Sequence, residues 1–151
     1  EGVRLVSIDR ENGRLLRARP ARFLANTREM AMDEGTLYLV AKAQPGDREY
    51  TLWALDPSTL EERWKVRMAL DDPVVGMGPG EGVLTTGHYV QFYNLVDANL
   101  RWTCAAVIVD KQGKIAQTIL SEQPSARPPA CAVVPGGIVI ISDNLIERYG
   151  E

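Results

Sequence analysis

The sequence predicts an all-β protein. In Tyr50–Arg67, apolar residues alternate with other residues on both sides of a polar turn, Asp56–Thr59. This period-two pattern is typical of a β-hairpin with one buried face. Asp56 can accept hydrogen bonds from the turn amides, and Pro57 fixes the φ angle of the second turn position. Similar hairpins recur along the chain, and helical periodicity is confined to a short ambiguous stretch, Arg22–Met32.

Two further hairpins repeat the same plan: an apolar strand, a turn led by aspartate, and a strand richer in polar residues. They are Val3–Arg19 and Ala106–Leu120. In the first of them, Gly13 stands at the place that Leu60 takes in Tyr50–Arg67. We expect a left-handed turn residue at this place, because that conformation favours glycine.

A second kind of unit lies between these hairpins. It has a short apolar strand, a turn that contains glycine and a more strongly apolar strand, as in Met30–Ala41, Val75–Thr86 and Ala132–Ser142. Corresponding residues of these units are 45 and 57 positions apart (77 − 32 and 134 − 77). Two hairpins in each period make four antiparallel strands, which is the plan of a propeller blade. We therefore expect a β-propeller segment; a β-sandwich, the alternative, would not require the units to resemble one another.

The repeats divide the chain into about three four-stranded antiparallel blades within a single propeller segment, 1–151. The expected parts are an outer hairpin (3–19), a blade (27–67), a longer blade (72–120) with an insertion (88–102), and a partial blade (130–151). Propellers close with about four to eight blades, because an open array leaves bare strand edges. We therefore predict a part of a larger propeller, completed by further sequence or by another chain.

Two inner strands, Leu37–Val40 and Ile138–Ile141, are almost continuously apolar. Such runs are typical of strands that are covered on both faces, and neighbouring blades would supply that cover. Ser121–Ala130 is rich in proline and polar residues, and we expect it to connect the second blade to the third.

The composition argues against nucleic-acid binding and against a membrane-spanning segment. The chain has 151 residues, 17 basic and 20 acidic side chains and a formal net charge of −3, with no basic cluster, which argues against nucleic-acid binding. No apolar run is long enough to span a membrane. The sequence starts at Glu1 without a signal segment, so we expect a processed chain or a piece of a longer one.

The cysteines, Cys104 and Cys131, fit no metal-ligand spacing, and His88 is the only histidine. This excludes the usual zinc motifs. We expect two buried free thiols in preference to a disulfide, although two cysteines in an oxidising compartment would often pair.

One repeat carries a family resemblance. Leu52–Val66, LWALDPSTLEERWKV, has an apolar strand, an aspartate, a turn and a tryptophan eight positions after the aspartate. In this pattern the chain resembles the pyrroloquinoline-quinone-like (quinoprotein-like) β-propeller repeats. Val6–Leu16 and Ile108–Ile119 keep the aspartate and a turn glycine, but Arg17 and Gln117 stand where the tryptophan would be. WD-repeat-like and other propeller subfamilies therefore remain open.

The resemblance implies the propeller fold. Quinoprotein dehydrogenases of this kind hold the quinone and Ca²⁺ with adjacent cysteines, a stacked tryptophan and acidic and amide ligands. This sequence has no adjacent cysteine pair and no recognisable metal-ligand cluster. We therefore take the resemblance to imply the fold and not the cofactor, and we expect no cofactor and no metal.

The insertion His88–Trp102 supplies the candidate site, because aromatic side chains and arginine on a projecting loop are typical of interaction hot spots. The predicted partner-binding residues are His88, Tyr89, Phe92, Tyr93, Arg101 and Trp102. The alternative is an extra hairpin that packs its aromatic side chains on its own blade. The recurring aspartates Asp9, Asp56 and Asp110 are explained by turn chemistry, and we expect no catalytic residue.

The function predicted from these observations is a non-catalytic propeller scaffold, or a protein-interaction segment of a larger assembly. The alternative is a fragment of a quinoprotein-like propeller oxidoreductase whose active-site residues lie outside this chain. A third option is a sugar-binding propeller that uses Trp102 and Tyr93 as stacking platforms. The resemblance also implies a periplasmic or cell-envelope location, where many such repeats occur.

Overall fold

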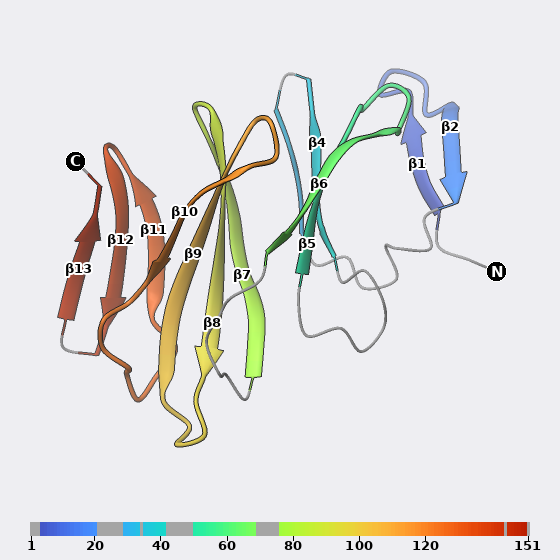
Figure 1. Cartoon of the computed structure of the whole chain (residues 1–151). Coiled ribbons are helices and arrows are strands. Elements are labelled where there is room, and N and C mark those ends of the chain that lie inside the picture. The colour runs from blue at the N-terminus through green and yellow to red at the C-terminus, as the bar shows by residue number, and fades with distance from the viewer. Residues whose placement is uncertain are drawn as a thin grey trace. The chain divides into compact units, whose positions relative to one another are not determined.

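The described part of the chain consists of β-strands and connections (Figure 1). The computed structural model describes residues 4–20, 29–33, 35–41, 50–68, 76–143 and 145–150. Within these ranges there are thirteen strands in antiparallel sheets of two to four strands, and no helix. Accordingly, these residues include no helix that is long and apolar enough to cross a membrane. The all-β prediction is confirmed.

The chain forms two compact units, Glu1–Leu70 and Asp71–Glu151. The first unit contains a two-stranded sheet and a four-stranded sheet in which consecutive strands are neighbours. Its strands are β1 (Arg4–Ile8), β2 (Leu15–Pro20), β3 (Glu29–Met32), β4 (Leu37–Ala41), β5 (Tyr50–Leu55) and β6 (Glu62–Met68).

The β1–β2 hairpin packs on one face of the β3–β6 sheet. Leu5 contacts a cluster of buried apolar side chains that β4, β5 and the β5–β6 turn contribute: Leu37, Leu39, Ala41, Trp53, Leu55 and Leu60. The guanidinium of Arg19 donates a hydrogen bond of 2.6 Å to the carbonyl oxygen of Leu60. All residues of β4 and β5 are buried, as expected for the run Leu37–Val40.

The second unit contains a four-stranded sheet and a three-stranded sheet, again with consecutive strands as neighbours. The four-stranded sheet consists of β7 (Gly76–Thr85), β8 (His88–Val96), β9 (Trp102–Asp110) and β10 (Ile115–Leu120). The three-stranded sheet consists of β11 (Ala130–Val134), β12 (Gly137–Ser142) and β13 (Leu145–Tyr149).

These two sheets share one apolar core. Val90, Phe92 and Ala106 of the larger sheet belong to the same buried cluster as Ile138 and Ile140 of β12. The other face of β12 is not covered by the described residues, since Ile141 on that face is 48% exposed. Within the described residues only one face of this strand is covered, so the expectation that neighbouring blades cover both faces of Ile138–Ile141 stays a prediction.

A disulfide joins the two sheets of the second unit through Cys104 in β9 and Cys131 in β11. The expectation of two free thiols is therefore wrong. Both cysteines lie on the faces that the sheets turn toward each other, within the shared core. The packing of the two sheets determines which strand faces meet. The spacing of the two cysteines in the sequence therefore cannot predict that they pair.

The aspartate-led turns have a common backbone pattern. In the β5–β6 turn, the carboxylate of Asp56 accepts hydrogen bonds from the amides of Ser58 (2.8 Å) and Thr59 (3.0 Å). The amide of Leu60 donates to the Asp56 carbonyl oxygen at 2.7 Å, and Leu60 has a φ angle of +59°. Gly13 has a φ angle of +70°, which confirms the left-handed turn residue expected at this place.

The insertion His88–Trp102 does not form a projecting loop. Most of it is the nine-residue strand β8, and Trp102 begins β9. The connection between them is a short turn led by Asp97, whose carboxylate accepts hydrogen bonds from the amides of Asn99 (2.8 Å) and Arg101 (2.9 Å). The predicted loop is therefore wrong: the extra residues lengthen two strands around a turn with the same amide hydrogen bonds as the turn that Asp110 leads.

Candidate functional site

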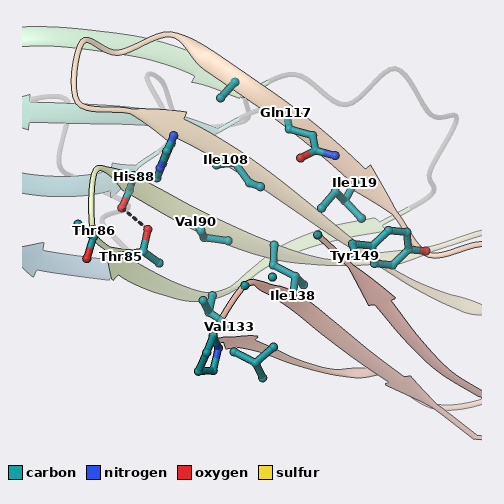
Figure 2. Close-up of a pocket in the computed structure, with 16 residues that line it drawn as sticks. Thr85, Thr86, His88, Val90, Ile108, Gln117, Ile119, Val133, Ile138 and Tyr149 are labelled. Carbon is teal, nitrogen blue, oxygen red and sulfur yellow. Dashed lines mark hydrogen bonds between the residues drawn. The ribbon is translucent and has the colours of Figure 1, made fainter.

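A cavity of about 540 Å³ opens between the two sheets of the second unit (Figure 2). It is lined on one side by residues of β8, β9 and β10, and on the other by the β11–β12 hairpin and the end of β13. Its volume is in the range that small-molecule sites in proteins occupy.

The walls of the cavity are mostly apolar. Val90, Ile108 and Ile119 come from the four-stranded sheet, and Val133 and Ile138 come from the three-stranded sheet. Val90 pairs with Ile108 across β8 and β9, so their side chains share one face of the sheet. Alternation along each strand turns these residues toward the opposite sheet, where they continue the shared core.

Polar groups lie at the end of the cavity formed by the β7–β8 turn. Thr85, Thr86 and His88 line it there, and Gly87 between them has a φ angle of +91° that lets the chain turn back sharply. The Thr85 hydroxyl donates a hydrogen bond of 3.2 Å to the carbonyl oxygen of His88. Figure 2 shows this bond.

Three side chains that line the cavity have hydrogen-bonding capacity to spare. The Thr86 hydroxyl, the His88 imidazole and the Gln117 amide line it, and none of them is hydrogen-bonded to another residue in the described part of the chain. Gln117 is carried by β10, where the pairing with β9 shifts register between Ile115 and Gln117. These groups can donate or accept bonds to a ligand without breaking a bond of the fold.

Tyr149 closes the opposite end of the cavity. Its hydroxyl lies 2.9 Å from Glu147 Oε1 and 3.3 Å from the carbonyl oxygen of Leu120. Glu147 Oε1 also accepts a hydrogen bond of 2.7 Å from the amide of Glu122. Burial, followed by the hydrogen bond to Glu147 and its negative charge, raises the pKa of Tyr149 to about 12. This hydroxyl therefore stays protonated and occupied.

Glu147 is a buried carboxylate on the inner side of the three-stranded sheet. Its residue is 9% exposed, and its Oε2 atom is buried without a hydrogen-bond partner among the described residues. The end of the cavity beside Tyr149 therefore carries negative charge close behind its wall.

The described lining of the cavity combines apolar walls with few titratable groups. Within the described ranges, no three His, Cys, Asp or Glu side chains gather as a metal-binding group. Among the described residues of the lining, the titratable side chains are His88 and Tyr149, whose hydroxyl is occupied. The cavity can enclose the apolar part of a small ligand and form hydrogen bonds to one polar group of that ligand.

The predicted partner-binding residues are not gathered on one surface. His88 lines the cavity, whereas Tyr89, Phe92 and Tyr93 are buried within β8 and are 2%, 3% and 0% exposed. Phe92 belongs to the core shared with the three-stranded sheet, and the Tyr89 hydroxyl donates a 2.9 Å hydrogen bond to buried Gln91. All three aromatic side chains are therefore packed inside the second unit, and Phe92 packs between the two sheets and not on its own sheet alone.

The other two predicted residues flank the start of β9. Arg101 is exposed and forms an ion pair of 2.9 Å with Asp97, so it supports the turn. Trp102 is partly buried and pairs with Ser125 through two backbone hydrogen bonds of 2.8 Å. This bridge ties the predicted connector Ser121–Ala130 to β9.

Sequence reasoning missed Gln117 and Tyr149 as residues of the cavity. Gln117 stands where the repeat pattern has a tryptophan, and it leaves a polar amide in the cavity lining. Tyr149 follows the alternation Glu147, Tyr149 along β13, which places both on the inner side of the sheet. That alternation was the available signal.

No protein-family model matches the chain, and no curated protein sequence is significantly similar to it. The resemblance to quinoprotein-like propeller repeats therefore stays a prediction from the sequence.

Proposed function

We propose that the protein is a non-catalytic β-propeller scaffold, a segment or subunit that presents its sheet faces to other blades of a larger assembly. The observation that carries this proposal is the outer face of the β11–β13 sheet. Its strands alternate, so Ile138 and Ile140 enter the core, while Val139 and Ile141 point the other way.

This outer face is apolar and exposed. Ile141 and Ile146 are directly paired across β12 and β13, and they are 48% and 71% exposed. Ala130 pairs with Ile141 on the other side, and Ala132 pairs with Val139. Only Arg148 adds a charge to this face of the described strands. A contiguous apolar surface of this kind marks an interaction site in soluble proteins.

The β1–β2 hairpin in the first unit has the same asymmetry. Its inner side contributes Leu5 to the core, whereas Val6 and Ile8 are 47% and 56% exposed. Leu15, the pairing partner of Ile8, is 58% exposed. The outer side of this hairpin thus exposes apolar side chains beside one charged residue, Arg4. Such an exposed side is what the proposal expects where a further blade would pack.

The proposal is tested by making the outer face polar. In the double variant Ile141→Ser with Ile146→Ser, we expect the second unit to stay folded, because both side chains are largely exposed in the described structure. The complete protein should lose the partner that covers this face, or lose thermal stability if the covering blade belongs to the same chain. Leu100→Ser, at a turn residue that is 75% exposed, is the matched control. A double variant that keeps wild-type association and stability would contradict the proposal.

The disulfide supports a second part of the proposal, which concerns location. Disulfides persist in oxidising compartments and are rare in the cytosol. The Cys104–Cys131 bond is therefore in keeping with the periplasmic or cell-envelope location that the sequence resemblance implies. To test the location, cells are lysed under denaturing conditions in the presence of a thiol-alkylating reagent. A protein from the cytosol would be alkylated at both cysteines, whereas a protein from an oxidising compartment would not be alkylated.

A further inference from the structure

We propose that the cavity in the second unit binds an amphipathic carboxylate, a molecule with an aliphatic body and one anionic head. The volume of about 540 Å³ and the walls formed by Ile108, Ile119, Val133 and Ile138 suit an apolar body. This function goes beyond a scaffold role and does not depend on it.

The uncommitted polar groups determine where the head binds. The His88 imidazole and the Thr86 hydroxyl lie at the end made by the β7–β8 turn, and the Gln117 amide lies on the adjoining β10 wall. Each of them can donate a hydrogen bond, and none donates one to the described residues. A head group with acceptor oxygens would therefore bind at the His88 end.

The charges around the cavity favour an anion at that end. Glu147 stands behind Tyr149 at the opposite end, and its carboxylate would repel a negative head there. Asp110 pairs with His88 across β8 and β9, but its carboxylate already accepts hydrogen bonds of 2.9 Å from the amides of Gln112 and Lys114. The same turn also carries the cation Lys114. The His88 end is thus the less negative of the two.

Binding is measured with decanoate on the whole protein, kept below its micelle concentration, by calorimetry and by amide chemical shifts. We expect saturable 1:1 binding, with the largest shifts in Thr85–Val90 and in the β11–β12 turn. Decanol and decylammonium, which share the body but not the anionic head, should bind at least tenfold more weakly. Equal binding of decanol or tighter binding of decylammonium would overturn the choice of a carboxylate.

Two matched variants locate the site. Ala116 is an exposed residue of β10 that lines the cavity, so the ring introduced by Ala116→Phe should narrow it and weaken decanoate binding at least tenfold. Thr118→Phe, at an exposed position of the same strand outside the lining, should leave binding unchanged. His88→Ala should weaken binding about tenfold, the effect of losing one hydrogen bond to a charged group.

The bare outer face of the β11–β13 sheet is a possible competing site for an aliphatic probe. The variant Ile146→Ser should therefore bind decanoate as the wild type does. No saturable binding by the wild type, or a loss of binding in Ile146→Ser but not in Ala116→Phe, would overturn the proposal.

Discussion

Leu60 and Leu100 have the same left-handed backbone, each with a φ angle of +59°, but opposite environments. Each amide donates a hydrogen bond to the carbonyl oxygen of the aspartate that leads its turn. Leu60 is 3% exposed and belongs to the core of the first unit, whereas Leu100 is 75% exposed. Glycine takes the corresponding place in two other turns, as Gly13 and Gly113. Burial therefore explains a leucine at 60 and does not explain one at 100.

Replacing these leucines by glycine should have opposite effects. In Leu100→Gly the left-handed strain of about 1–2 kcal/mol is removed, and the greater freedom of the unfolded glycine offsets part of it. We expect a gain of about 0.5–1 kcal/mol in the free energy of unfolding. Leu60→Gly should instead lose about 2–4 kcal/mol, because a core side chain is deleted. Urea unfolding measures both, and a shift in the same direction for both variants would contradict this explanation.

The carboxylate of Asp56 should remain ionised to an unusually low pH. The hydrogen bond from Arg63 at 2.7 Å, followed by those from the Thr59 and Ser58 amides, lowers the pKa of Asp56 from 3.8 to about 2. Because the folded pKa is the lower one, its contribution to stability is present above about pH 4. That contribution is lost as the pH falls toward 2. An NMR titration of the carboxyl carbon measures this pKa.

The same titration in Arg63→Gln gives the control for Asp56. The pKa of Asp56 should rise toward its ordinary value, since the first of its causes is removed. The pKa of Asp97, which is lowered chiefly by the Arg101 amide, should not change. If the pKa of Asp56 were unchanged in this variant, the ion pair between Asp56 and Arg63 would not form in solution.

For Tyr149 we predict a loss of stability at alkaline pH, because its pKa is raised and not lowered. Its folded pKa is raised from 10.0 to about 12 by burial and by Glu147, so the fold favours the protonated hydroxyl. The resulting stability is fully present below pH 10 and is lost as the pH rises toward 12. In Tyr149→Phe this part of the alkaline destabilisation should be absent. Unfolding curves of the two proteins between pH 9 and pH 12 would refute the assignment if they fell in parallel.

The disulfide should be present in the purified protein and should stabilise the second unit. Without reductant, the denatured chain should contain no thiol that reacts with a thiol reagent. Because Cys104 and Cys131 are 27 residues apart, closing this loop contributes about 3.5 kcal/mol to the free energy of unfolding. Reduction should remove that amount, and a Cys104→Ala, Cys131→Ala variant should not respond to reductant. Two reactive thiols in the untreated protein would show that the bond is absent.

Strands and turns could be predicted where local chemistry determines them. The alternation around Asp56 and the place of Gly13 suffice, because hydrogen bonds to turn amides form within a few residues. The sequence does not identify β8 as a strand, because polar and apolar residues are mixed on both of its faces. Gln91 is 0% exposed there, and its side-chain amide is hydrogen-bonded by the Tyr89 hydroxyl and to the Phe92 carbonyl oxygen.

The cavity could not be predicted, since it depends on how two sheets pack. His88 was singled out in the sequence, but its neighbours in space, Gln117 and Tyr149, come from β10 and β13. The pairing of Cys104 with Cys131 has the same origin. Alternation along one strand tells which residues share a face, and it does not tell which other sheet that face meets.

The central claim is that further blades cover the bare apolar faces of this protein. Native mass spectrometry of the protein isolated from its source tests it most directly. We predict a species heavier than the 16.7 kDa of this chain, in which additional polypeptide is bound or is part of the same molecule. A folded, lone monomer of 16.7 kDa, with Ile141 and Ile146 still open to solvent, would contradict the account.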